Sequence, residues 1–212
     1  MRHHVWYAIT DLGNLIILVP CVLLIGLLLL LPASTRRLFV VWLIIVALGG
    51  TLVATTKVLF MGWRLGIESL DFTGLSGHTT LAFLAWPVAF ALLLGQTDSM
   101  RAVGAAIGVL LASLVGVSRV EIQAHSVSEV VFGGLLGIAL SGLFLVRYGQ
   151  ALKVVVFPRW LALTLVLPLI LGYGQVLPTE SILGSVARAL SGHTFVYTRF
   201  DLHSAVLSIP PH

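Results

Sequence analysis

Two long apolar runs of the chain are separated by the stretch SRVEIQAHSVSE, residues 118–129. Three ionisable side chains, Arg119, His125 and Glu129, lie here at the edge of apolar sequence, where such groups are rare and usually functional. His125 and Glu129 are four residues apart, so they share one face of a helix that begins near Ala124. A carboxylate there can accept the proton of one imidazole nitrogen and make the other a better nucleophile or base. The alternative is an ordinary loop end that carries these residues.

The composition is that of an integral membrane protein. Of the 212 residues, 58% are hydrophobic and only 9% are charged, and the mean hydropathy is +1.08. No soluble domain needs so much apolar sequence. The net charge of +4 comes from dispersed basic residues, so no nucleic-acid partner is expected. Cys21 is the single cysteine, which excludes a disulfide framework and a cysteine-based metal site.

Apolar stretches of about 20 residues predict membrane-spanning helices. We expect six of them, at about 12–31, 38–56, 76–94, 101–117, 125–146 and 155–173. The expected fold is therefore an all-α polytopic membrane protein, a bundle of six transmembrane helices, in one domain of residues 1–173. The tail, residues 174–212, is polar and is not a span. Within it, Ser181–Leu190 fits a short amphipathic interfacial helix that Gly192 ends.

Six spans would place both termini and the second and fourth connections on one side of the membrane. The basic residues divide equally between the two sides. We leave out those suspected of chemistry and those in the tail, remote from any span: Lys57, Arg64, Arg119, Arg188 and Arg199. The remaining excess, near Arg36, Arg37, Arg101 and the 147–159 connection, indicates the cytoplasmic side. The second and fourth connections then face outward.

The second connection, residues 57–76, carries groups that suit a phosphate ligand. Lys57 and Arg64 are seven residues apart and share a face if the helix continues past Gly62. Their charges could neutralise phosphate oxygens. Ser76 can cap the next helix, whose first amides, at Gly77 and beyond, then point at an anion.

The fourth connection would supply the chemistry if helix packing brings the two connections together. Arg119 offers a planar fork of donors for phosphate. His125, oriented by Glu129, would attack phosphorus in line and form a phosphohistidine, while His78 would donate a proton to the leaving oxygen. No carboxylate cluster suited to Mg²⁺ accompanies these residues, so we expect the cations to replace a metal and no cofactor to be needed.

Together these residues form three blocks: Lys57-x6-Arg64, Ser76-Gly77-His78 and Ser118-Arg119-x5-His125-x3-Glu129. The blocks resemble the signature of the type 2 phosphatidic acid phosphatase superfamily, over residues 57–129. That superfamily includes bacterial undecaprenyl pyrophosphate phosphatases. The resemblance implies that His78 is the general acid, His125 the nucleophile and Glu129 its orienting partner. It also implies a phosphate-binding set, consisting of Lys57, Arg64, Ser76, Gly77 and Arg119.

Three positions depart from the family pattern. Leu65 and Leu75 replace prolines, which affects loop stiffness more than chemistry. Glu129 replaces an aspartate, and a carboxylate misplaced by ~1 Å can cost ~100-fold in rate. Slow turnover, a compensating helix shift and a catalytically inactive relative are therefore all open.

The expected function is metal-independent hydrolysis of a membrane lipid phosphomonoester or pyrophosphate, of the undecaprenyl pyrophosphate or phosphatidate type, through a phosphohistidine. With the orientation above, the resemblance implies a bacterial inner membrane protein whose site faces the periplasm. The alternatives are a lipid phosphotransferase that uses the same residues and a non-enzymatic protein that binds or transports lipid phosphates.

Several other polar residues receive ordinary interpretations. Ser191–Thr194 repeats the tetrapeptide of residues 76–79, but no basic block lies at the matching spacing, so we treat it as coincidence. Glu68 and Asp71 fit solvated loop charges, although a part in shaping the pocket is open. His203 fits a lone surface histidine.

Overall fold

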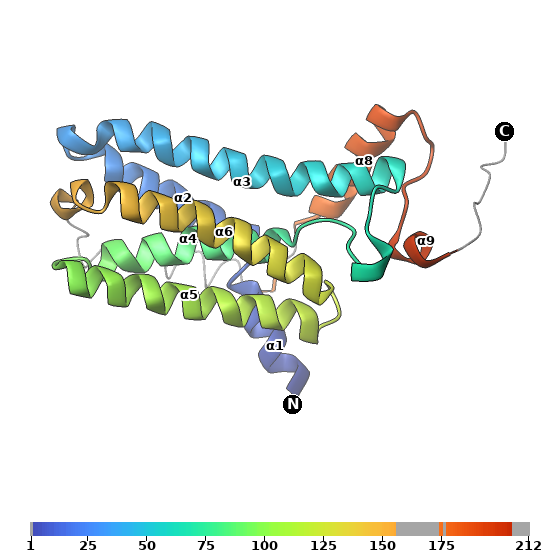
Figure 1. Ribbon diagram of the computed structural model, residues 1–212, viewed down its shortest axis with the longest axis horizontal. Coiled ribbons are helices and arrows are strands. Elements are labelled where there is room, and N and C mark those ends of the chain that lie inside the picture. Colours follow the sequence, from blue (N-terminus) through green and yellow to red (C-terminus); the bar gives the residue numbers. More distant parts are fainter. Residues whose placement is uncertain (1, 156–173, 176, 205–212) are drawn as a thin grey trace.

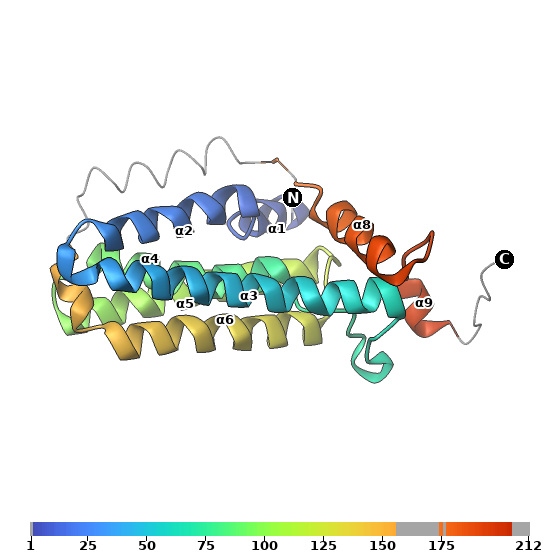
Figure 2. The ribbon, with the colours of Figure 1, turned by 90° about the horizontal axis from the view of Figure 1, so that it is seen from above.

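Long helices lie side by side in the computed structural model, which describes residues 2–155, 174–175 and 177–204 (Figures 1 and 2). The long helices are α2 (Leu15–Leu30), α3 (Arg36–Trp63), α4 (Gly77–Leu94), α5 (Asp98–Glu121) and α6 (Val127–Tyr148). A short helix, α1 (Arg2–Asp11), precedes them, and two further short helices, α8 (Thr179–Ser191) and α9 (Arg199–His203), belong to the tail. The predicted all-α class is confirmed.

Polar side chains set where the apolar helices begin. Asn14, Ser76, Thr97 and Ser126 cap α2, α4, α5 and α6, each accepting a hydrogen bond from a backbone N–H of the first turn. Such a cap satisfies a donor that has no partner inside the helix. These caps place the helix starts close to where the apolar pattern predicts them.

The predicted count of six spans is not confirmed. Among the described residues, five stretches are long and apolar enough to cross a membrane: His4–Leu30, Ala33–Trp63, Gly77–Leu94, Asp98–Glu121 and Val127–Tyr148. The sixth predicted helix, at about 155–173, lies outside the described residues except for Val155, which is not helical.

The second predicted helix, ending near residue 56, is too short. α3 continues to Trp63, so Lys57 lies within the helix and not in the connection. The continuation buries Val58, Phe60 and Gly62, and this burial outweighs the single charge that interrupts the apolar pattern.

Helix α4 lies at the centre of the bundle and packs most extensively against α5 and α6. Small residues allow the close approach. A Cβ atom added to Gly108 of α5 would stand 2.5 Å from the Cα of Pro87 in α4, and one added to Gly133 of α6 would stand 3.0 Å from the carbonyl oxygen of Ser76. The positions of α5 and α6, and of the loops between them, are therefore set by backbone contacts with α4.

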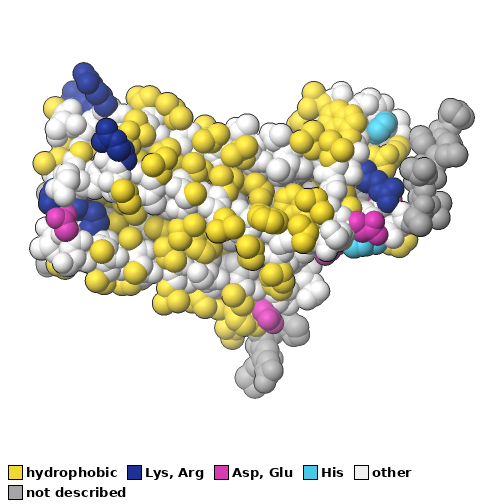
Figure 3. All heavy atoms as spheres, in the orientation of Figure 1, with side chains coloured by type: hydrophobic (Ala, Val, Ile, Leu, Met, Phe, Trp, Pro, Cys, Tyr) yellow, Lys and Arg dark blue, Asp and Glu magenta, His cyan; other side chains and the backbone are white. Residues whose placement is uncertain are grey.

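The two ends of the bundle carry different groups. At one end, shown at the left in Figure 1, Asp98 accepts from Arg101 at 3.1 Å and from Lys153 at 2.8 Å. The other end holds the α3–α4 connection, the α5–α6 turn and the tail helices (Figures 1 and 2). On the face shown in Figure 3, hydrophobic side chains cover the length between these ends. The second and fourth connections thus lie at the same end.

The tail packs on the end of α3. Its helix α8 stops at Gly192, which adopts φ +75° and donates its N–H to the Arg188 carbonyl at 2.9 Å. A helix with the predicted glycine stop is thus present, and its place at the membrane interface stays a prediction. Tyr197 N–H then donates to the Met61 carbonyl at 2.8 Å. The proposed boundary between a membrane domain and a tail at residue 173 stays a prediction.

Candidate active site

The turn that ends α5 delivers His125. Gln123 adopts the left-handed conformation at φ +57°, its N–H donates to Val120 at 2.9 Å, and Ala124 N–H donates to Arg119 at 3.0 Å. This pair of bonds is a Schellman motif, which satisfies the last carbonyls of the helix and reverses the chain. His125 follows at once, close to the start of α6.

The first turn of α6 positions Glu129. Ser126 and Glu129 form a capping box, in which Glu129 N–H donates to the Ser126 hydroxyl at 3.4 Å and Ser126 N–H donates to Glu129 Oε2 at 3.3 Å. Glu129 Oε2 also lies 2.6 Å from His125 Nδ1, and the carboxylate is fully buried. The extra methylene of glutamate, relative to the family's aspartate, therefore does not prevent contact with the imidazole.

Glu129 also joins the second connection to the fourth. Thr73 donates to Glu129 Oε1 through its N–H at 2.8 Å and through its hydroxyl. Ser76 N–H donates to the Glu129 carbonyl at 3.1 Å. Because one residue of α6 binds both ends of the 73–76 segment, the start of α4 and the start of α6 are held side by side.

Ser76, Gly77 and His78 begin α4 at this junction. The Ser76 hydroxyl caps the helix by accepting from Thr79 N–H at 3.4 Å, and Ser76 is fully buried. The turn between α1 and α2 packs directly on the first turn of α4. A Cβ added to Gly13 would lie 3.2 Å from His78 Cβ. His78 is within electrostatic range of Lys57, Arg119 and His125.

Lys57 reaches the site from α3. Gly74, at φ +144°, lets the connection pass against the helix, because a Cβ there would stand 3.1 Å from Lys57 N. The Lys57 side chain is 14% exposed, and its Nζ lies 3.3 Å from Glu180 Oε1 of α8. The Glu180 side chain is 72% exposed, so this ion pair is open to water and is readily exchanged for another anion.

Arg119 has a hydrogen-bond donor without a partner among the described residues. Its Nη1 donates to the Thr10 hydroxyl at 3.2 Å, while its Nε is buried and has no hydrogen-bond partner in that part of the chain. A buried donor without a partner is costly and calls for an acceptor. The guanidinium is therefore able to bind a further anionic oxygen.

Burial and the neighbouring cations favour the neutral form of His125. Burial lowers the pKa of His125, whereas the hydrogen bond with Glu129 raises it, and the positive charges of Lys57 and Arg119 lower it. The net effect is a pKa below its usual value of 6.5. With Nδ1–H donating to Glu129, Nε2 carries the free lone pair that a nucleophile needs.

Arg64 is directed toward the tail. It follows the last residue of α3 in the left-handed conformation, at φ +57°, and its Nη2 donates to the carbonyls of Ser204 at 2.7 Å and Leu202 at 3.4 Å. Continuing the helix thus does not place Arg64 on the same face as Lys57, because the backbone turns at Arg64 itself. Its part in phosphate binding stays a prediction.

Sequence reasoning missed Thr10, Thr73 and Arg199. Arg199 was expected to be remote from any span, but its Nη2 lies 2.8 Å from Glu129 Oε2. Asp71, interpreted as a solvated charge, pairs with Arg199, and its Oδ1 lies 2.8 Å from Nε2 of His203, which is therefore not a lone histidine. No local signal marks these contacts, because the partners are distant in sequence.

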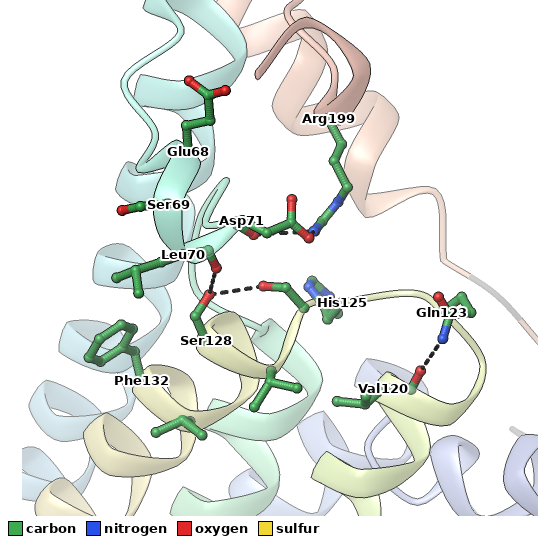
Figure 4. A pocket seen from close by; sticks show the side chains of 13 residues that line it. Glu68, Ser69, Leu70, Asp71, Val120, Gln123, His125, Ser128, Phe132 and Arg199 are labelled. Atoms are coloured by element: carbon green, nitrogen blue, oxygen red, sulfur yellow. Dashed lines mark hydrogen bonds and ion pairs between the residues drawn. The ribbon is translucent and has the colours of Figure 1, made fainter. Parts of the chain in front are cut away.

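A cavity of about 760 Å³ opens beside His125 (Figure 4). Polar groups from the 68–71 segment and apolar groups from α6, among them Val131 and Phe132, line it. His125 borders this cavity, and the positive charges of Lys57 and Arg119 act on its imidazole. The site thus combines a buried imidazole–carboxylate pair, cations and a partly apolar recess.

Comparison with known proteins identifies the family of the chain. Residues 62–153 match the PAP2 superfamily, a range that contains Arg64, the start of α4 and the turn bearing His125. The chain is also 38% identical over 203 residues to a Klebsiella pneumoniae protein described as "Uncharacterized 22.5 kDa protein in cps region", and the alignment covers 93% of this chain and 97% of that protein. No solved structure matches the chain. The predicted family is confirmed, and the chain belongs to the PAP2 superfamily.

Proposed function

We propose that the protein is an integral membrane phosphatase that hydrolyses a lipid phosphomonoester or pyrophosphate, of the undecaprenyl pyrophosphate or phosphatidate type. The contact that carries this proposal is the 2.6 Å pairing of His125 Nδ1 with the buried Glu129 carboxylate. This contact leaves Nε2 as the nucleophilic nitrogen, within the field of Lys57 and Arg119. Membership of the PAP2 superfamily supports the same chemistry.

The proposed reaction has two steps. His125 Nε2 attacks the terminal phosphorus, the bond from that phosphorus to the oxygen that stays with the lipid product breaks, and His78 gives its proton to that leaving oxygen. Water then attacks the phosphohistidine, giving its proton to His78, so that inorganic phosphate leaves and both imidazoles return to their first state. A phosphate dianion beside Lys57 and Arg119 favours the protonated imidazolium that His78 needs for the first step.

Cations and amides would bind the transferred group. The buried Nε of Arg119 is available, and Lys57 can exchange the exposed Glu180 carboxylate for phosphate. The first amides of α4, beginning at Gly77 after the Ser76 cap, form a helix N-terminus suited to an anion. Only the resemblance to the family pattern assigns Arg64 to the phosphate-binding set.

The lipid part of the substrate would occupy the cavity beside His125. Its apolar wall includes Val131 and Phe132, which are 48% and 42% exposed on the side of a candidate span. A chain entering from the bilayer could reach this wall while its headgroup stayed at the end of the bundle. The basic residues at the opposite end favour an orientation with this site on the periplasmic side of a bacterial inner membrane.

Two other functions use the same residues. In a lipid phosphotransferase, an acceptor alcohol would replace water in the second step. In a lipid-phosphate binding or transport protein, the phosphate would bind and leave unchanged. The site favours an enzyme over a binding protein, because a binding protein does not require a histidine nucleophile oriented by a buried carboxylate.

Phosphate release tests the proposal directly. We expect purified protein in detergent to release inorganic phosphate from phosphatidate or undecaprenyl pyrophosphate with EDTA present, and vanadate to inhibit the release. His125→Ala should abolish it. His193→Ala, in the second Ser-Gly-His-Thr sequence of the tail, is the matched control and should retain it.

The outcomes separate the three functions. Phosphate transferred to an added alcohol, with little release to water, would identify a transferase. Tight lipid binding without turnover would identify a binding protein. Normal turnover by His125→Ala would exclude the proposed nucleophile.

A further inference from the structure

Arg199 and His125 bind the same oxygen of Glu129. Arg199 Nη2 lies 2.8 Å from Glu129 Oε2, and His125 Nδ1 lies 2.6 Å from that atom. Thr73 holds the other oxygen, Oε1, through its N–H at 2.8 Å. The carboxylate is therefore held on both sides, and its orientation toward the imidazole depends on a residue of the tail.

The charge of Glu129 needs a partner of opposite charge. Its side chain is 0% exposed, and a buried carboxylate is stable only when it is paired and hydrogen-bonded. His125 cannot supply a permanent charge, because burial favours its neutral form. Arg199 always carries a positive charge, and within the described residues no other lysine or arginine forms an ion pair with Glu129.

Arg199 is itself fixed in place. Its Nη1 donates to the carboxylate of Asp71 and, at 3.2 Å, to the carbonyl of the same residue. His203, one turn further along α9, lies 2.8 Å from the other Asp71 oxygen, and Arg64 binds the carbonyl of Ser204 at 2.7 Å. Figure 4 shows Arg199 reaching from the tail to Asp71 above the cavity. The tail helix α9 is thus docked on the second connection by several contacts.

We propose that Arg199 is a positioning residue of the active site, which holds Glu129 as a carboxylate aimed at His125 Nδ1, and that α9 is therefore part of the catalytic unit. This inference rests on the proposed function. Arg199 also lines the cavity beside His125, but the role proposed here is exerted through Glu129. Its loss should therefore slow the chemical step and leave substrate binding largely unchanged.

Kinetics of Arg199→Ala and Arg199→Lys test the proposal with phosphatidate in detergent micelles. For Arg199→Ala we expect kcat to fall ~10–100-fold, the cost known for losing a residue that orients a metal-bound histidine, with KM nearly unchanged. Arg199→Lys should recover part of kcat. Arg188→Ala is the matched control, because Arg188 lies in the same tail and its Nη2 donates to Ser185. It should leave kcat unchanged.

A double substitution tests whether Arg199 works through Glu129. In a Glu129→Gln background, Arg199→Ala should cause little further loss of kcat, because the charge that Arg199 holds is already absent. Additive losses would overturn the proposal, and so would a kcat within twofold of wild type in Arg199→Ala. Thermal unfolding of each variant shows whether the fold is retained.

A measurement without turnover separates this proposal from the proposed function. In protein labelled with ¹⁵N-histidine, the Nδ1–H proton of His125 should resonate far downfield because of its short bond to a carboxylate. We expect Arg199→Ala to shift or remove this signal and Arg188→Ala to preserve it. If wild type released no phosphate but the signal still depended on Arg199, the proposed function would fail and the positioning role would stand. A signal that stayed unchanged in Arg199→Ala would overturn the positioning role.

Discussion

Shortening Glu129 tests the geometry of the catalytic pair. Glu129→Asp restores the residue type of the family pattern, so a resemblance alone predicts equal or faster turnover. The structure predicts the opposite, because Glu129 Oε2 already lies 2.6 Å from His125 Nδ1. We expect the substitution to slow hydrolysis.

The expected size follows from the contacts. Residue 129 is the third residue of α6, and its backbone is held by the capping box and by the bond from Ser76 N–H. Removing one methylene withdraws the carboxylate by about 1.5 Å, one carbon–carbon bond. The distance to His125 would then approach ~4 Å, beyond hydrogen bonding, and the contacts with Thr73 and Arg199 would lengthen similarly. Misplacement on this scale costs ~100-fold in rate.

The assay is kcat for phosphate release from phosphatidate, together with thermal unfolding in detergent. Glu121→Asp makes the same chemical change at an exposed position at the end of α5 and is the control. It should leave kcat unchanged. A Glu129→Asp enzyme as fast as wild type, or faster, would refute the reasoning from the observed distances.

The charges of the site and the packing of the bundle lead to four further predictions. Arg119→Lys should reduce kcat/KM for phosphatidate ~10-fold or more, because an ammonium cannot replace the planar fork, and steady-state kinetics will measure this. Because the pKa of His125 lies below 6.5, its neutral form persists in acid, and the acidic limb of the kcat/KM profile should have its midpoint below pH 6.5. Glu129→Gln should move that midpoint further down, because Glu129 raises the pKa of His125. Gly108→Ala should destabilise the bundle by ~1–3 kcal/mol through overpacking. Gly142→Ala is the control and should not destabilise it, because the added Cβ would have no neighbouring atom of the described structure within 4 Å. Thermal unfolding compares the two variants.

Much of the framework could be predicted from local sequence. Long apolar runs must become helices if they cross a bilayer, because only a helix satisfies its own backbone there. The contact between His125 and Glu129 is also local, but a shared helix face does not explain it. The helix begins at Val127 rather than near Ala124, so His125 precedes the Ser126 cap and meets Glu129 across the first turn. The sequence Ser126-x-x-Glu129 is a capping box as well, which explains why glutamate fits this position. The stop of α8 at Gly192 follows from the same kind of short-range chemistry.

The apolar pattern of the sequence does not predict the end of a helix where the burial of apolar side chains competes with a charge. The end of α3 was placed before Lys57 because a charge interrupts the apolar run. The helix instead continues to Trp63, since Val58 and Phe60 gain burial by remaining helical. The direction of Arg64 depends on its left-handed backbone and on carbonyls of the tail. Neither can be read from the spacing of Lys57 and Arg64.

The sequence by itself determined the family, the all-α class and the pairing of His125 with Glu129. Only the tertiary structure decided what surrounds that pair: Thr73, 56 positions before Glu129, and Arg199, 70 positions after it. Such partners meet because apolar helices and a docked tail bring distant segments to one end of the bundle. The hydrophobic effect that drives this packing is non-directional, so no short stretch of sequence records which polar groups it brings together.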